Sequence, residues 1–179
     1  TPLNSVILLS SLLAKNNKEN LNPSDIQKAN VINESGNELL RLINDILDLS
    51  KIESGKMELI VDEIDSNNLV QHYNEIFSHT AEDRNLEFKV IDNINGVFYN
   101  DKDRLGQVIR NLISNSFKFT KEGCITLEIS NTSNEKLPIK VSVTDTGMGI
   151  PKDKQELIFK AFTQADGSTS REYGGTGLG

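Results

Sequence analysis

Residues 111–120 read NLISNSFKFT, and the rest of the sequence is organised around this stretch. Asn111 and Asn115 stand four positions apart, so on a helix their side chains project from one face, one turn from each other. Their amide oxygens are hard, neutral ligands, and Mg²⁺ prefers oxygen donors that it shares with phosphates and waters. Lys118, three residues beyond Asn115, adds a positive charge for a phosphate. The stretch is therefore a candidate for binding a metal together with a phosphate.

Two glycine-rich segments follow, DTGMGI at residues 145–150 and GGTGLG at residues 174–179, with IFKAF at residues 158–162 between them. Glycine lets a backbone approach a ligand closely, and successive backbone N–H groups can receive phosphate oxygens. Asp145 follows a predicted strand, where we expect a buried carboxylate that accepts a hydrogen bond from an exocyclic amine such as that of adenine. The alternative is a turn aspartate with structural glycines.

In this order, the four segments resemble the N, G1, F and G2 boxes of the two-component sensor histidine kinases, and the resemblance extends over essentially the whole chain. Residues 162–166, FTQAD, resemble the hybrid members, which carry a receiver domain downstream. The resemblance implies a protein-histidine kinase with ATP and Mg²⁺ as cofactors. Related ATPases of the gyrase, chaperone and mismatch-repair group hydrolyse ATP with a glutamate where this chain has Asn111.

The resemblance also assigns roles within the site. Asp145 would read adenine, and Asn115 would ligate Mg²⁺ with Asn111 in the same catalytic region. Phe119 would pack near adenine, although a core role is an alternative. Ser116 replaces the usual alanine, and we expect little consequence from that change. The ATP-binding residues implied are Asn111, Asn115, Lys118, Phe119, Asp145, Gly147, Gly149, Gly175, Thr176, Gly177, Leu178 and Gly179.

The first third of the chain predicts two helices, at residues 1–15 and 25–53, with Asn22 and Pro23 marking the second start. Ile32, Leu39 and Ile46 recur every seven residues, and so do Leu42 and Leu49. This pattern predicts a short coiled-coil seam, and two helices alone bury too little apolar surface. We therefore expect a dimeric four-helix bundle from a hairpin at residues 1–54, the alternative being a hairpin packed on its own globular domain.

Residues 55–179 predict a second, ATP-binding domain of mixed helices and strands. We expect an edge strand at 56–64, strands at 86–91 and 97–99, and a central antiparallel hairpin formed by 125–129 and 139–143. Helices begin after Asp65 and after Asp101 or Asp103, and the second of them should bury Val108 and Leu112 along with its other apolar residues. The fold class is thus α+β, a helical hairpin followed by a two-layer sandwich, which the resemblance identifies as the Bergerat ATP-binding type.

Composition limits the partners. With 179 residues, 36% of them hydrophobic, and a net charge of −7, the chain suits one or two soluble domains and argues against nucleic acid and anionic membranes as partners. A single cysteine excludes an internal disulfide framework. No apolar run reaches the length of a membrane span, so we expect a cytoplasmic segment, with a membrane anchor elsewhere in a parent protein left open.

The acceptor histidine is the remaining question. In the family it lies four positions before the threonine of a His-Glu-x-x-Thr-Pro box, of which the chain has Thr1 and Pro2, so we expect it just upstream. Thr1 matches the position that helps to orient water in members with phosphatase activity. His72 and His79 match no acceptor position.

A non-catalytic dimeric scaffold is the non-enzymatic alternative, and a receiver domain is the expected partner.

Overall fold

The computed structural model describes residues 2–17 and 19–158, and these form two compact units that meet between Met57 and Glu58. Each unit is described by itself. The boundary lies three residues beyond the one expected after residue 54. Thr1, the segment at 158–162 beyond its first residue and the glycine-rich segment at 174–179 lie outside the described residues.

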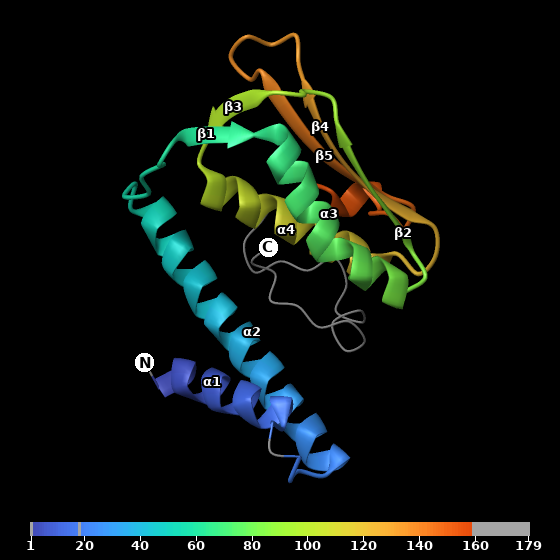
Figure 1. Ribbon diagram of the computed structural model, residues 1–179. Coiled ribbons are helices and arrows are strands. Elements are labelled where there is room, and N and C mark those ends of the chain that lie inside the picture. The colour runs from blue at the N-terminus through green and yellow to red at the C-terminus, as the bar shows by residue number, and fades with distance from the viewer. Residues whose placement is uncertain (1, 18, 159–179) are drawn as a thin grey trace. The chain divides into compact units, whose positions relative to one another are not determined.

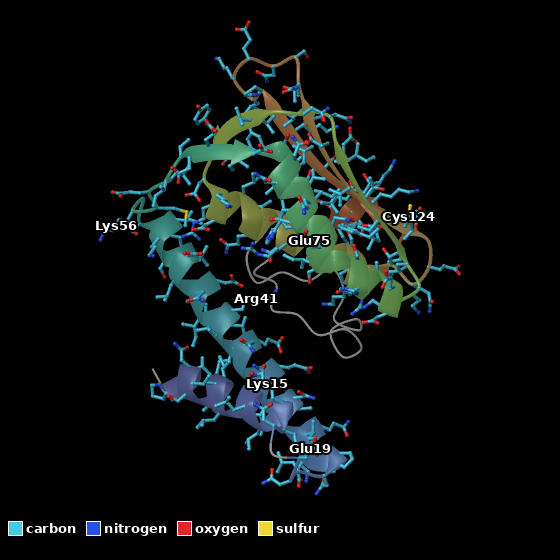
Figure 2. The ribbon with its side chains drawn as sticks, in the orientation of Figure 1. Lys15, Glu19, Arg41, Lys56, Glu75 and Cys124 are labelled. Atoms are coloured by element: carbon cyan, nitrogen blue, oxygen red, sulfur yellow. The ribbon has the colours of Figure 1, made fainter. Side chains whose placement is uncertain are left out.

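The first unit is a hairpin of α1 (Pro2–Lys15) and α2 (Pro23–Glu53), as predicted (Figure 1). Figure 2 labels Lys15 at the end of α1 and Glu19 in the turn that follows. Asn22 caps α2, because its side-chain oxygen accepts a hydrogen bond from the backbone N–H of Asp25 at 2.9 Å. A proline in the first turn costs no helical hydrogen bond, so the sequence begins α2 at this position.

Small residues bring the two helices together. A Cβ at Gly36 would stand 2.8 Å from Cγ1 of Ile7, so only glycine lets α2 approach α1 this closely. Asn33 Nδ2 donates to the Ile7 carbonyl at 2.7 Å and to Ser10 Oγ at 3.1 Å. Ala29 and Ser10 are both buried at this contact between the helices.

The predicted seam on α2 is largely solvent-exposed in the single chain. Leu39 is 50% exposed and Ile46 is 48% exposed, and Leu42 and Leu49 are half-buried. Further exposed apolar residues of this hairpin are Val6, Leu8, Leu9, Leu12, Leu13, Val31, Ile32, Ile43, Leu47 and Ile52. An apolar face this extensive on one hairpin is typical of a surface that another helical element covers.

The second unit contains two sheets. β1 (Asp62–Asp65) pairs antiparallel with β3 (Val97–Asn100). The other sheet has the order β2 (Glu87–Asp92), β4 (Cys124–Asn131), β5 (Ile139–Asp145).

The expectation of an edge strand over 56–64 was wrong for residues 56–61, which form no strand. Asp62 pairs with Asn100, and Asp101 directly after it caps a helix. The partner strand therefore ends there, and the residues before Asp62 have no ladder to join.

The two strand pairs of this sheet differ in direction. β4 and β5 form the expected antiparallel hairpin, but β2 runs parallel to β4. Parallel strands need a long crossover connection, and here the chain between them contains β3 and a helix. The α+β class itself is confirmed, with a helical hairpin followed by an α/β domain.

Two helices, α3 (Ser66–Asp83) and α4 (Lys102–Phe119), lie on one face of the β2–β4–β5 sheet (Figure 1). Asp65 caps α3 by accepting from the N–H groups of Asn67 and Asn68. Asp101 caps α4 by accepting from the N–H of Arg104 at 3.0 Å. These caps satisfy backbone donors that a helix start otherwise leaves open, so both helices begin where the aspartates stand. A short 3₁₀ helix, Lys152–Lys154, follows the sheet.

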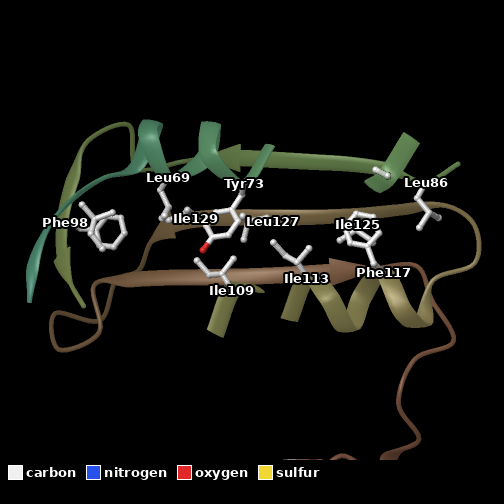
Figure 3. Close-up of a cluster of buried hydrophobic side chains, with 12 residues drawn as sticks. Leu69, Tyr73, Leu86, Phe98, Ile109, Ile113, Phe117, Ile125, Leu127 and Ile129 are labelled. Carbon is white, nitrogen blue, oxygen red and sulfur yellow. The ribbon is translucent and has the colours of Figure 1, made fainter. Parts of the chain in front are cut away.

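The core lies between these helices and the sheet (Figure 3). β4 contributes Ile125, Leu127 and Ile129, all fully buried, from alternate positions of one strand face. α4 contributes Ile109 and Ile113, one turn apart and equally buried. Each such side chain stabilises the unit by roughly 1.5–3 kcal/mol, so this contact fixes α4 on the sheet.

Candidate functional site

One face of α4 stays open while its opposite face is buried in the core. Asn111 is half-buried and Asn115 is exposed, one turn apart as predicted. Val108 and Leu112, which we expected in the core, are 55% and 43% exposed and belong to this same stripe. The apolar positions were misassigned because the helix carries two apolar stripes, and only the one through Ile113 meets the sheet. The open face thus combines amide oxygens with apolar surface, which suits a ligand with a polar and a flat part.

The last turn of α4 is held from two sides. Arg84, at the end of α3, donates from Nη1 to the Phe117 carbonyl at 2.8 Å. The Thr120 N–H donates to the Ser116 carbonyl at 3.0 Å. Lys118 Nζ lies 5.2 Å from the ring centroid of Phe119. The positive charge and the aromatic ring therefore stand together at the end of the helix that carries the asparagines.

Asp145 is the last residue of β5, and its carboxylate is held by two hydrogen bonds. Ser116 Oγ donates to Oδ2 at 3.1 Å, and the backbone N–H of Gly147 donates to Oδ1 at 2.9 Å. Asp145 is exposed, so the expectation of a buried carboxylate was wrong. Its orientation comes from these two donors and not from burial.

The role of Ser116 was missed from the sequence. The serine was expected to have little consequence, whereas the structure makes it the link between α4 and Asp145. Both residues belong to segments that the motif pattern had already singled out, but the bond joins positions 29 residues apart. No local pattern of spacing carries that contact.

Gly147 is required by its surroundings, and Gly149 is favoured by its backbone conformation. A Cβ at Gly147 would stand 2.6 Å from the Phe119 carbonyl oxygen, 2.9 Å from Asp145 Oδ1 and 3.0 Å from Thr120 Oγ1. Gly149 has a φ of +67°, a value that residues other than glycine rarely adopt. The loop after β5 can therefore lie directly against the end of α4, with its backbone open to a ligand.

Two threonines lie at the corner where the loop after β5 meets the end of α4. Thr146 Oγ1 accepts from the Cys124 N–H at 3.0 Å and donates to the Glu122 carbonyl at 3.2 Å, which fixes the loop after β5 on the turn before β4. Thr120 Oγ1 is buried and has no hydrogen-bond partner among residues 2–17 and 19–158. A buried hydroxyl without a partner is uncommon in proteins, so the corner has polar capacity left over for a ligand or a water.

The candidate metal ligands at this site are the side-chain amide oxygens of Asn111 and Asn115. Within the part of the chain that the structure describes, no group of three or more His, Cys, Asp or Glu side chains is placed to hold an ion. Asn111 and Asn115 are oxygen donors on one face, and Mg²⁺ bound through phosphates and waters needs only one or two protein ligands. The donor chemistry thus fits a metal that arrives with a phosphate.

The remaining residues considered in the sequence fall into two groups, those outside the described residues and the two histidines. Thr1 and the set from Gly175 to Gly179 lie outside the described residues. His72 and His79 are exposed on α3, and Nδ1 of His79 lies 3.6 Å from Oε2 of Glu82. No helix among the described residues combines the length and apolarity needed to cross a membrane.

Comparison with known families matches two models to this chain. Residues 1–55 match the His Kinase A (phospho-acceptor) domain. Residues 100–179 match the histidine kinase-, DNA gyrase B- and HSP90-like ATPase domain. The second match covers both the Asn111–Asn115 stripe and the loop after β5.

Curated relatives match over the full length of the chain. Signal transduction histidine-protein kinase BarA of Escherichia coli (strain K12) is 40% identical over 100% of this chain and 20% of its own length. Hybrid signal transduction histidine kinase L of Dictyostelium discoideum is 38% identical over 100% of this chain and 10% of its own length. The chain therefore spans about a fifth or less of these relatives.

Solved structures agree with the fold. Full-length ShkA in complex with AMPPNP superimposes with a TM-score of 0.73 at 29% identity, over 99% of this chain and 36% of that one. The catalytic domain of the histidine kinase ThkA gives a TM-score of 0.56 at 25% identity, over 68% of this chain and 76% of that one.

Proposed function

This chain belongs to the two-component sensor histidine kinases, and on that premise we propose that it is a kinase core that binds Mg·ATP and transfers the γ-phosphoryl group to a histidine. From the histidine the phosphoryl group passes to an aspartate of a receiver domain. One observation carries the nucleotide site: Asp145, Gly147 and the end of α4 form a single hydrogen-bonded corner beside Asn111 and Asn115.

The adenine ring belongs at this corner. The Asp145 carboxylate is acceptor-only when ionised, and each oxygen retains a lone pair after the bonds from Ser116 and Gly147. A 6-amino group is a donor that such a carboxylate can take. Gly147 leaves the loop flat against α4, and the unpartnered hydroxyl of Thr120 supplies further polar capacity. Phe119, half-buried beside them, can flank the ring.

The phosphates belong along the open face of α4. We propose that Asn115 ligates Mg²⁺ and that Asn111 lies in the same metal and phosphate region. Lys118 would add a positive charge for the phosphates. Gly175 to Gly179 would give backbone N–H groups to the distal phosphates, as the family resemblance implies. The ion would neutralise charge on the transferring phosphoryl group.

The transfer needs little covalent chemistry from these residues. The bond between the γ-phosphorus and the ADP oxygen breaks, a bond from an imidazole nitrogen to that phosphorus forms, and the imidazole releases its proton. The protein's contribution is to position the two reactants and neutralise charge. Asn111 has an amide, which cannot take a proton from water as a glutamate can, and this argues against the hydrolytic alternative.

The hairpin supplies the partner surface. We propose that the exposed seam through Leu39 and Ile46 forms a homodimeric four-helix bundle, and that a receiver domain, in the same parent chain or separate, takes the phosphoryl group. A solved structure of ThkA in complex with the response regulator TrrA supports this class of partner. A kinase that uses ATP works where ATP is abundant, so we propose a cytoplasmic location.

Calorimetric titration with ADP tests the adenine assignment. We expect Asp145→Asn to weaken ADP binding by roughly 1–3 kcal/mol, because a hydrogen bond from the amine to a charged group is lost. Asp83→Asn, at the exposed end of α3, is the matched control. Equal ADP affinity in the Asp145 variant and the wild type would refute the site.

The magnesium assignment needs a separate comparison. Asn115→Ala should reduce the gain in AMPPNP affinity that Mg²⁺ produces, while ADP binding in EDTA stays unchanged. If the variant loses affinity equally with and without Mg²⁺, Asn115 contacts nucleotide directly and the metal role is wrong. Release of phosphate from ATP at a rate that depends on Asn111 would instead favour the hydrolytic alternative.

A further inference from the structure

Ser116 carries a buried hydroxyl. It lies inside the proposed nucleotide corner, which is formed by the end of α4, Asp145 and Gly147. It is 5% exposed and stands on the core side of α4, between the exposed Asn115 and the buried Phe117. A serine inside a helix commonly returns its hydrogen bond to the carbonyl four residues earlier. Here its hydroxyl reaches Asp145 Oδ2 at 3.1 Å, on a different element.

The two donors to Asp145 act differently. Gly147 is two residues away, so its N–H moves with the loop that also carries Asp145. The bond from Ser116 comes from α4, which the core and the cap at Asp101 hold in place. Of the two donors to the carboxylate, only the serine belongs to the helix against which a nucleotide would lie.

We propose that Ser116 is a positioning residue that fixes the Asp145 carboxylate for the exocyclic amine of adenine, and so sets the preference for adenine over bases without that amine. This inference rests on the proposed function. A hydroxyl next to an ionised carboxylate must donate, because the carboxylate has no proton to give. One lone pair of Oδ2 is thereby occupied and the carboxylate is oriented before the nucleotide arrives. The ordering cost is then met during folding and not during binding.

The test compares ADP with inosine diphosphate, whose base carries an oxygen in place of the amine. The affinities of both are measured by calorimetry for the full chain and for Ser116→Ala. We expect Ser116→Ala to weaken ADP binding about three- to tenfold, while inosine diphosphate changes less than about twofold. Ser114→Ala, an exposed serine on the same helix, is the control and should leave the ratio unchanged. Ser116→Thr retains the hydroxyl and should restore the ratio.

A second measurement needs no nucleotide. Without the Ser116 bond, Asp145 holds the Gly147 N–H less firmly, so we expect hydrogen exchange of that amide to accelerate about fivefold in Ser116→Ala. An equal loss of both nucleotides, or an unchanged ratio, overturns the positioning role, as does a folded threonine variant that behaves like the alanine one. If the wild type binds neither nucleotide, the proposed function fails, and amide exchange alone decides the positioning of Asp145.

Discussion

Gly147 lies so close to Phe119 that an added Cβ would stand 2.6 Å from the Phe119 carbonyl oxygen. The Met148 N–H also points to this oxygen, at 3.4 Å. The first glycine of the loop after β5 is thus in contact with the last residue of α4, and the two parts of the proposed nucleotide site share one backbone contact. A side chain at position 147 must separate them.

Gly147→Ala should therefore open the corner. Overpacking of this kind costs roughly 1–3 kcal/mol, and the neighbour that must move is backbone, which cannot rotate away. We expect a lower thermal midpoint and a weaker ADP affinity measured by calorimetry. Gly96→Ala is the control, because the nearest atom to its added Cβ is 3.9 Å away. Wild-type ADP affinity in Gly147→Ala would contradict the contact.

Asp101 gives the globular unit a defined response to acid. Its Oδ1 accepts from the Arg104 N–H at 3.0 Å and its Oδ2 accepts from the Ile60 N–H at 2.9 Å. These two backbone hydrogen bonds, that of Arg104 first, hold the pKa of the carboxyl below its ordinary 3.8. The folded state therefore favours the ionised form, and its contribution to stability is fully present above about pH 4 and disappears as the pH falls through the folded pKa.

We expect the urea midpoint of the wild type to fall as the pH is lowered below about 4, and Asp101→Asn to show less of that fall. Asparagine is still a good helix cap, so the variant keeps the start of α4 while losing the titrating group. Asp103→Asn removes a neighbouring charge and keeps the Asp101 carboxylate, which makes it the control. Identical acid profiles for Asp101→Asn and the wild type would refute this assignment. Circular dichroism follows the transition.

Helix starts were predictable because their signals are local. Asn22 and Asp65 were identified as caps from the residues beside them, and the structure places both where expected. For α4 the sequence offered Asp101 or Asp103, and the structure shows the first. A cap bonds to N–H groups two or three residues away, so sequence neighbours carry the information.

The features that the sequence did not predict correctly depend on contacts between distant segments. Residues 56–61 alternate only loosely, with Met57, Leu59 and Val61 at every second position, and a strand also needs a partner, which here ends at Asn100. Val108 and Leu112 are apolar, but which helical stripe meets the sheet is decided by tertiary packing. The hydrogen bond from Ser116 to Asp145 also joins distant segments, and no local sequence pattern near either residue predicts it. The family resemblance supplied the segments of the site and missed this link.

Charge on the apolar seam of α2 should prevent association. Leu39→Glu with Ile46→Glu would put two carboxylates without partners into each chain's half of a four-helix bundle, at a cost of several kcal/mol per ion. We expect light scattering to report a dimer for the wild type and a monomer for the double variant. Asn30→Glu with Asn44→Glu is the control, since both positions are exposed and lie roughly 140–180° around the helix from Leu39. A wild type that is monomeric at high concentration would contradict the bundle.

The two histidines of this chain should accept no phosphoryl group. His72 and His79 lie on α3, inside the same unit as the proposed nucleotide site, and the side chain of His79 is 88% exposed. Transfer requires an imidazole nitrogen in line with the γ-phosphorus at roughly 3–3.5 Å. An acceptor on the hairpin of a dimer can be brought to that position. A histidine fixed on α3 moves together with the proposed nucleotide site, so its distance from that site does not change.

Incubation with γ-labelled Mg·ATP, followed by a search for acid-labile, alkali-stable label, checks this. We expect no such label on the 179-residue chain, and label on a chain extended to include a histidine four positions before Thr1. The extended chain with glutamine at that histidine is the matched control and should stay unlabelled. Label that maps to His72 or His79 at a comparable rate would overturn the acceptor assignment. An extended chain that binds ATP but takes no label would favour a nucleotide-binding scaffold over a kinase, because binding and dimerisation would then persist without transfer.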